Sequence, residues 1–349
     1  MGLETVEETL VRKILNSYKS LRGIRKKKKV PNVFERIGYV TASQISVTNY
    51  PRRPLTAFNP SLISKNNEVH LFIRLIFDYY DYVSSIGYSK IKINEVEALP
   101  QLNLNTKLVL YPSTPNEIKR GTEDPRAHEY FNDFLIFYTA VGLRDGSLWP
   151  KQGYAIIDST SLEVTKKGVL YLSDGVSDYQ LPSWKNTIAL KYSSKTVNIL
   201  TRPLVAGHEV IWRGVLETDE EAWRLNYKNM DVFMVNESWE VKVGVSTPPV
   251  RIGSDEYLIG WHGIDQNLIY SNGIAVVNSQ GELLGISDYL LWPSTIEELY
   301  GDRPMVIYGS GLLKRGNEIF WIGGVADYAI GIYKADLDII LENVRWLRG

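Results

Sequence analysis

Short apolar strand patterns recur along the chain, and each copy ends on a residue of a different kind. The copies are Val69–Arg74, Asp133–Thr139, Thr196–Arg202, Glu256–His262 and Glu318–Gly323. Their ends follow one another about every 60–65 residues, a fixed period that is typical of a repeat array. An all-β unit of this size fits one blade of a β-propeller. We therefore predict an all-β fold, a five-bladed β-propeller.

The residues between these strands also favour a β fold. From Val30 onward, short β-branched and aromatic runs are separated by Gly, Pro, Asn, Asp and Ser at hairpin-like intervals. A doubly wound α/β fold is disfavoured, because strand patterns do not alternate with helical patterns. Tyr308–Gly316 holds closely spaced glycines but lacks the spacing of a nucleotide-binding loop, so it is weak evidence for a nucleotide site.

The N-terminal residues follow a helical pattern. Apolar residues recur at helical spacing from Leu3 to Leu21, and Gly23 is placed to end the helix. The basic run Arg25–Lys29 fits either a nucleic-acid or membrane patch or a solvated hinge. We favour the hinge, because the rest of the chain is not basic. We therefore divide the chain into residues 1–30, an amphipathic helix with a basic hinge, and residues 31–349, the propeller. The helix is expected to pack on the propeller flank or on a second subunit, which leaves a homo-oligomer open.

Composition narrows the class of protein. A formal net charge of −1 over 349 residues argues against nucleic acid as a partner. No apolar run reaches the roughly 18–20 residues that span a bilayer, so no membrane partner is expected. The acidic N-terminus differs from a signal peptide, and we expect a cytoplasmic protein. With 4 His and no Cys the chain offers no thiolate metal site, and neither a metal nor a cofactor is predicted.

The ends of the repeated strands form the first candidate site. In a propeller, equivalent positions of successive blades face one channel, so Arg74, Arg202 and His262 are predicted to converge. Neighbouring cations raise the energy of the compact state unless an anion binds between them. Phosphate is a natural occupant, because arginine can hold it through parallel hydrogen bonds. Lys185 is a further candidate for the same cluster.

Gly121–Arg126 (GTEDPR) is the most unusual short segment, with adjacent carboxylates before a proline and an arginine. Pro125 is expected to hold Asp124 in an extended conformation that aims its carboxylate. In this interpretation Arg126 pairs with Glu123 and leaves Asp124 for chemistry. The alternative is an ordinary polar turn that leads into the second blade.

A basic anion pocket beside carboxylates favours glycosyl transfer. An acid protonates the glycosidic oxygen while a nucleophile attacks the anomeric carbon. Asp327 follows the fifth strand and is expected to bring a second carboxylate to the same end of the channel. A phosphate nucleophile is already anionic and needs no general base, whereas water needs a carboxylate to activate it. Glu123 and Asp265 are the candidates for that base.

Several segments occur in an order and at a spacing that are specific together. They are Phe58–Ser61 with Val69–Arg74, Thr122–Arg126, Leu200–Pro203, Ser246–Val250 with Tyr257–Gly263, and Gly324–Leu337. With these segments the chain resembles glycoside hydrolase family 130, the inverting mannoside phosphorylases and related mannosidases with a five-bladed propeller. The resemblance extends from about Asn59 to Ile340.

The resemblance implies a role for each candidate residue. Asp124 is implied to be the catalytic acid, with its proton passing through a hydroxyl of the bound mannose. Lys185, Arg202 and His262 are implied to bind inorganic phosphate, which is a co-substrate and not a cofactor. The residues implied to bind the reacting sugar are Asn59, Arg74, Tyr270 and Asp327.

These implications favour an inverting phosphorylase that cleaves a β-mannoside, a manno-oligosaccharide, with phosphate to give mannose 1-phosphate. Its partners are then the oligosaccharide and phosphate. The alternatives are a β-mannosidase of the same family and a non-catalytic glycan-binding propeller. The family's hydrolases lack the basic set, so Arg202 and His262 favour phosphorolysis. The aromatic residues expected either to stack on sugars or to pack within blades are Trp149, Trp184, Trp292 and the cluster Tyr79–Tyr82.

Overall fold

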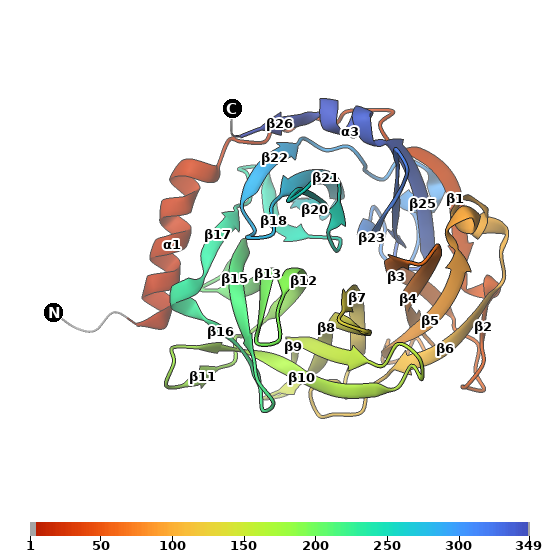
Figure 1. Cartoon of the computed structure of the whole chain (residues 1–349), viewed down its shortest axis with the longest axis horizontal. Helices are drawn as coiled ribbons and strands as arrows, with labels where there is room; N and C mark the ends of the chain where they lie inside the picture. Colours follow the sequence, from red (N-terminus) through yellow and green to blue (C-terminus); the bar gives the residue numbers. More distant parts are fainter. Residues whose placement is uncertain (1–4, 348–349) are drawn as a thin grey trace.

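The structure is a computed structural model that describes residues 5–347. Its strands form antiparallel blades around a central channel, which confirms the five-bladed propeller (Figure 1). From the channel outwards, blade one contains β3 (Thr56–Lys65), β4 (Glu68–Ile76), β5 (Ser84–Lys92) and β6 (Leu104–Leu110). Blade two contains β7 (Gly121–Tyr130), β8 (Asp133–Arg144), β9 (Ser147–Ile157) and β10 (Val164–Ser173). Blade three contains β12 (Trp184–Tyr192), β13 (Thr196–Val205), β15 (Ile211–Thr218), β16 (Trp223–Asn226) and β17 (Asp231–Met234).

The last two blades draw strands from both ends of the chain. Blade four contains β18 (Glu240–Val245), β20 (Tyr257–Asp265), β21 (Tyr270–Val277), β22 (Leu283–Ser287) and the C-terminal β26 (Val344–Trp346). Blade five contains β23 (Ile307–Arg315), β24 (Glu318–Val325), β25 (Ala329–Asp336) and β1 (Glu35–Thr41). Because β1 pairs antiparallel with β25, an early strand completes the last blade.

Short elements lie within and between the blades. The short strands are β2 (Ile45–Val47), β11 (Asp178–Tyr179), β14 (His208–Glu209) and β19 (Val250–Arg251). The short helices are η1 (Ala42–Gln44), η2 (Ile93–Gln101), η3 (Tyr227–Asn229), α2 (Ile296–Leu299) and α3 (Leu337–Glu342). No helix among residues 5–347 combines the length and the apolar character needed to cross a membrane.

The repeated strands of the sequence occupy one position in every blade. All of them lie in the second strand from the channel, namely in β4, β8, β13, β20 and β24. Each second strand runs antiparallel to the innermost strand of its blade, so its end lies beside the start of that inner strand. Arg74 pairs with Phe58 of β3, and Arg202 pairs with Lys185 of β12. The period therefore brings the strand ends to one end of the channel.

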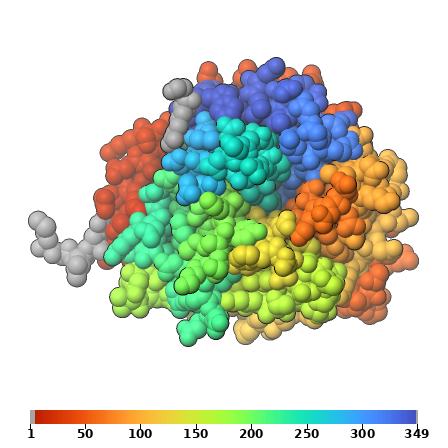
Figure 2. Space-filling model, in the orientation of Figure 1, coloured from red at the N-terminus to blue at the C-terminus, as the bar shows by residue number. Residues whose placement is uncertain are grey.

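The predicted N-terminal helix is α1 (Val6–Leu21), which lies on the flank of the ring beside blade three (Figure 2). Thr5 caps it, since its hydroxyl accepts a hydrogen bond from the backbone amide of Glu8. Leu10 and Ile14 are buried against the blade-three core, which matches packing on the propeller flank. Leu3 lies outside the described residues, and both the homo-oligomer and the domain boundary at residue 30 stay predictions.

In the basic run after this helix, Lys26–Lys29 are exposed, in line with the expected solvated segment, whereas Arg25 is buried. Arg25 is only 2% exposed, and its guanidinium donates to Glu240 at 2.7 Å and to the carbonyl of Val235 at 2.8 Å. Glu237 and Glu240 are buried carboxylates of blade four that require a cation. Arg25 therefore attaches the segment between α1 and β1 to blade four.

Candidate active site at one end of the channel

A cavity of about 80 Å³ lies at the channel end where the inner strands begin. All the residues that the sequence analysis assigned to the site line it. The full lining is Asn59, Arg74, Asp124, Lys185, Asn186, Arg202, His262, Tyr270, Arg303, Val306, Tyr308 and Asp327. These residues come from all the blades, so the cavity exists only in the closed ring.

A shared bulge aims the inner-strand residues into this cavity. In β3, β7 and β12 one extra residue interrupts the pairing with the second strand, directly after Phe58, Glu123 and Lys185. The residue that follows has a left-handed backbone, with φ of 45° at Asn59, 51° at Asp124 and 60° at Asn186. Asn and Asp tolerate this conformation better than other residues with a side chain, because they can hydrogen-bond locally.

The extended conformation predicted for Asp124 is therefore wrong. Its φ of 51° is left-handed, although Pro125 follows it. The bulge requires a left-handed backbone at this residue. The hydrogen bonds between β7 and β8 hold the bulge in place, and they outweigh the preference of a residue before proline for an extended backbone. The carboxylate of Asp124 still points into the cavity, but the bulge directs it there, not an extended backbone.

Arg74 holds both carboxylates of the GTEDPR segment. Its guanidinium contacts Asp124 at 2.7 Å and Glu123 at 2.9 Å, while Asn59 donates to the same Asp124 oxygen at 2.7 Å. Burial acts to raise the pKa of Asp124, but the charges of Arg74 and Arg126 and the hydrogen bonds from Asn59 and Arg74 outweigh it. The pKa of Asp124 consequently falls to about 2.

The predicted pair of Arg126 with Glu123 does not form. Arg126 instead donates to the carbonyl of Asp124 at 3.0 Å and to the hydroxyl of Tyr308 at 2.7 Å. Asn186 donates to the same hydroxyl at 3.0 Å. Arg126 therefore supports the backbone of Asp124 and the hydroxyl of Tyr308, while Glu123 is bound by Arg74.

Asp327 provides the second carboxylate of the cavity, as the sequence suggested. It follows the end of β24 with a left-handed backbone, φ of 57°. Burial raises its pKa to about 6, with Arg74 opposing and Asp124 adding to the increase. The two aspartates therefore differ in charge state: Asp124 is held ionised, whereas Asp327 titrates close to neutral pH.

Lys185, Arg202 and His262 lie together at the blade-three and blade-four side of the cavity. Arg202 is 8% exposed, and its Nε and Nη1 have no hydrogen-bond partner within residues 5–347. Its nearest carboxylate is Glu209, at 4.0 Å from Nη2. Burial lowers the pKa of Lys185, and Glu123 and Asp124 oppose that shift. Buried donors without a partner are costly, which marks this corner as a place for an anion.

His262 contributes a neutral imidazole to the same corner. Burial lowers its pKa well below the usual value, and the charge of Arg202 adds to the effect. Its Nδ1 lies 2.8 Å from the hydroxyl of Ser246, whereas its buried Nε2 has no partner in the described part of the chain. Tyr270 stacks on the ring with centroids 5.6 Å apart, and Tyr308 lies at 5.1 Å.

The sequence analysis did not identify Asn186, Arg303, Val306 and Tyr308 as cavity residues. Arg303 lies 5.0 Å above the ring of Tyr270 and sits in an irregular segment before β23, where no repeat pattern could reveal it. Of these residues, Asn186 could have been found from the repeat. It follows Lys185 at the position of blade three that Asp124, after Glu123, occupies in blade two.

The aromatic residues considered for sugar stacking divide into separate groups. Trp184 is 2% exposed and donates to Thr201, so it belongs to the core. Trp149 packs under Lys151 with 3.6 Å between the ammonium and the ring, and Trp292 lies beside Lys29. Only the Tyr79–Tyr82 cluster approaches the site, because Tyr82 lies 5.8 Å from the guanidinium of Arg74.

The proposed bases for a water nucleophile do not line the cavity. Glu123 is bound to Arg74, and Asp265 accepts hydrogen bonds from the backbone amides of Asn267 and Ile269. Among residues 5–347 no group of acidic and histidine side chains is arranged to hold a metal ion.

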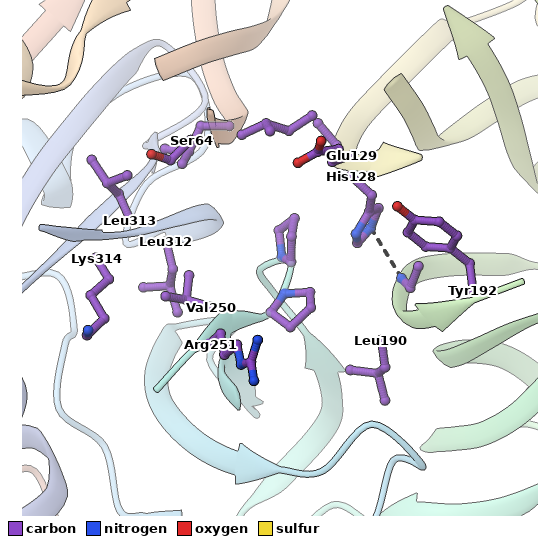
Figure 3. A pocket seen from close by; sticks show the side chains of 16 residues that line it. Ser64, His128, Glu129, Leu190, Tyr192, Val250, Arg251, Leu312, Leu313 and Lys314 are labelled. Carbon is purple, nitrogen blue, oxygen red and sulfur yellow. Dashed lines mark hydrogen bonds between the residues drawn. The ribbon is translucent and has the colours of Figure 1, made fainter. Parts of the chain in front are cut away.

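The other end of the channel contains a second cavity, of about 310 Å³ (Figure 3). Figure 3 shows Leu190, Leu312 and Leu313 around it, together with the charged Arg251 and Lys314. It also contains a histidine, His128, whose Nε2 accepts a hydrogen bond from the amide of Ala189 at 3.2 Å.

Comparison with known proteins agrees with this geometry. The sequence model of one family, described as beta-1,4-mannooligosaccharide phosphorylase of glycoside hydrolase family 130, matches residues 24–346. A beta-1,2-mannobiose phosphorylase of Thermoanaerobacter sp. (strain X514) is 26% identical over 293 residues, which cover 79% of this chain and 88% of that protein.

Solved structures share the fold. The beta-1,2-mannobiose phosphorylase from Listeria innocua, in complex with beta-1,2-mannobiose, has a TM-score of 0.66 at 15% identity, over 89% of this chain and 99% of that chain. A second structure comes from work on the GH130 family of mannoside phosphorylases, which contains hydrolases that target beta-1,2 mannosidic linkages in Candida mannan. Its TM-score is 0.59 at 13% identity, over 88% of this chain and 96% of that chain.

A closed propeller with carboxylates beside cations at one end of its channel is compatible with a glycoside-cleaving enzyme. Because the family model covers most of the chain, the protein belongs to glycoside hydrolase family 130, whose members are mannoside phosphorylases and glycoside hydrolases.

Proposed function

We propose that the protein cleaves a β-mannoside with inorganic phosphate and inversion, and releases mannose 1-phosphate. The observation that carries this proposal is the set of buried, unpartnered nitrogens of Arg202 and His262 in the cavity that also contains Asp124. A bound phosphate would accept hydrogen bonds from these groups, which water in so small a space satisfies less completely.

Arg202 and His262 have complementary tasks in phosphate binding. Arg202 offers a fork of N–H groups, which suits two phosphate oxygens. Neutral His262 adds a donor at Nε2 when its Nδ1 accepts the Ser246 hydroxyl proton, and it does so without adding another positive charge beside Arg202. Lys185 supplies a charge that does not require fixed geometry.

Asp124 serves as the acid in this proposal. In the free protein its low pKa keeps it ionised, so it must gain a proton before the reaction. A phosphate dianion bound beside Lys185 adds negative charge to the cavity, which raises the pKa of Asp124 towards protonation. We infer that phosphate binding both supplies the nucleophile and prepares the acid.

The bond changes follow from these positions. A phosphate oxygen forms a bond to the anomeric carbon from the face opposite the leaving group, and the glycosidic bond breaks. The proton of Asp124 passes to a hydroxyl of the reacting mannose, whose own proton neutralises the leaving oxygen. Asn59, Arg74, Tyr270 and Asp327 hold that mannose, and the product carries the inverted configuration.

The names of the relatives support a β-1,2 linkage. Both the Thermoanaerobacter relative and the Listeria structure are beta-1,2-mannobiose phosphorylases, although the family description names beta-1,4-mannooligosaccharides. We therefore propose β-1,2-mannosides as the first substrates to test, with β-1,4-mannobiose as the comparison.

A direct test incubates the protein with each mannobiose, with and without phosphate, and follows mannose 1-phosphate by ³¹P NMR. The expected result is product only with phosphate, in the α configuration. Release of free mannose at the same rate without phosphate would assign the protein to the hydrolases of the family, and no reaction with either sugar would favour a glycan-binding propeller.

A further inference from the structure

A surface groove of about 570 Å³ adjoins the sugar side of the candidate active site. It lies between blade one and the segment that carries α2. Its lining is Thr41, Ala42, Ser43, Leu55, Thr56, Tyr79, Ile296, Glu297, Tyr300, Gly301, Asp302 and Tyr328. Apart from Tyr79, which belongs to the tyrosine cluster considered for sugar stacking, none of these residues has a role in the proposed function.

The groove and the active-site cavity share a wall. Asp302 lines the groove while Arg303 lines the cavity, and Tyr328 lines the groove while Asp327 lines the cavity. Backbone bonds fix this wall, because the amide of Arg303 donates to the carbonyl of Ala326 at 3.0 Å. A ligand that extends from the cavity past this wall therefore enters the groove.

Tyrosines connect the two spaces along the rim. Tyr82 lies 5.8 Å from the guanidinium of Arg74, and its hydroxyl reaches the carbonyl of Asp327 at 3.4 Å. Tyr79 stacks on Tyr82 with ring centroids 6.2 Å apart, and burial together with the nearby charge of Asp302 raises the pKa of Tyr79 to about 12. An aromatic path thus leads from the reacting sugar to the groove.

The lining favours an uncharged polyhydroxy ligand. None of its described residues is Lys, Arg or His, and Glu297 and Asp302 make it acidic, so a phosphorylated or carboxylated ligand is disfavoured. Tyr300 is 78% exposed, and Tyr79 is 51% exposed. Exposed aromatic faces suit the C–H faces of a pyranose, while carboxylates and hydroxyls accept and donate hydrogen bonds to its hydroxyl groups.

The direction of the reaction also points to this groove. The proposed phosphate corner, at Arg202 and His262, belongs to blades three and four. Arg74 and Asp327, beside the reacting sugar, belong to blades one and five. Because the nucleophile attacks opposite the leaving group, the leaving saccharide departs away from blades three and four. The groove lies on the side of blades one and five.

We propose that this groove binds the leaving-group saccharide beyond its first unit, so that uncharged β-mannosides longer than a disaccharide are the preferred substrates. The inference rests on the proposed phosphorolysis for its direction. Tyr300 and Tyr79 are specificity-determining residues that stack on the chain, and they take no part in bond breaking.

Synthesis from mannose 1-phosphate tests the proposal, with mannose, mannobiose and mannotriose as acceptors. We expect the KM for the acceptor to fall with its length. Tyr300→Ala should raise the KM for mannotriose about three- to tenfold, leave the KM for mannose 1-phosphate unchanged, and be rescued by Tyr300→Phe. Tyr80→Ala is the matched control, since Tyr80 is 94% exposed in the same tyrosine run as Tyr79 but outside the groove.

Equal KM values for all acceptors, or an unchanged KM for mannotriose in Tyr300→Ala, would overturn the groove assignment while phosphorolysis itself stands. If no acceptor reacts, the proposed function fails, and calorimetric binding of mannotetraose still tests the groove. Binding that Tyr300→Ala weakens supports the groove in that case, and binding that it leaves unchanged rejects it.

Discussion

The two ends of the channel each contain a buried histidine, and the two histidines differ in one respect. Burial lowers the pKa of His128 to about 3 and also lowers the pKa of His262. His128 Nε2 accepts a backbone hydrogen bond, whereas His262 Nε2 has no partner within the described residues. Burial and a shifted pKa therefore do not distinguish the two ends of the channel, whereas unsatisfied polar atoms that line a cavity beside carboxylates do.

The charged groups at the two ends show the same contrast. At the far end Arg251 donates to the carbonyls of Gly253 and Ser254, at 2.9 Å each. At the end with the candidate site, Arg202 is buried and its Nε and Nη1 have no hydrogen-bond partner in the described part of the chain. Arg251 at the far end is therefore satisfied by its own chain, whereas Arg202 keeps buried donors that an anion could use.

The largest expected effect is at Asp124. Asp124→Asn should reduce phosphorolysis about 10²- to 10⁴-fold, because Asn cannot donate the proton of a carboxylic acid. Asn also tolerates the left-handed backbone, so the bulge is kept. The rate of mannose 1-phosphate formation measures the loss, and an unchanged melting temperature is the control. Turnover at the wild-type rate would remove Asp124 from the mechanism.

The next largest effect is a difference between Arg202 and Arg251 in the KM for phosphate. Arg202→Ala should raise the KM for phosphate about 10- to 100-fold, since it removes charge-assisted hydrogen bonds. Arg251→Ala, the matched change at the far end, should leave that KM unaltered. Initial rates over a range of phosphate concentrations measure both. Equal changes in the two variants would contradict the distinction between the channel ends.

The third effect concerns the stability contributed by His128 as pH changes. Its folded pKa of about 3 lies below its unfolded value, so the unfolded chain takes up a proton first as pH falls below about 6.5. Stability should therefore fall between about pH 6.5 and pH 3, by at most about 1.4 kcal/mol per pH unit from this group. Urea unfolding of His128→Asn should show a shallower slope in this window.

The control for that slope is His208→Asn, at a half-buried histidine on the flank beside α1. A slope of His128→Asn that equals the wild-type slope would mean that His128 is not kept neutral by the fold.

The smallest effect is expected at Lys314, a charged residue of the far cavity. Lys314→Ala should change kcat/KM by no more than about twofold, as is usual for substitutions away from a functional site. The same phosphorolysis assay measures it. A loss of tenfold or more would show that the far end of the channel takes part in the reaction.

The sequence predicted most of the site, because the repeat period carried spatial information. Arg74, Arg202 and His262 end equivalent strands, so closure of the ring was enough to bring them together. Arg303 could not be found in this way, since it lies in an irregular segment. The conformation of Asp124 was also missed, because the bulge depends on pairing with β8 and not on Pro125 alone.

The pairing of β1 with β25 has a consequence for the order of synthesis. β1 leaves the ribosome long before β25, its strand partner, and until then both of its edges are unpaired, which exposes it to aggregation. Asp124 is made early, whereas Arg303 and Asp327 arrive with the last blade. A nascent chain therefore cannot assemble the cavity until the residues of the last blade have been made.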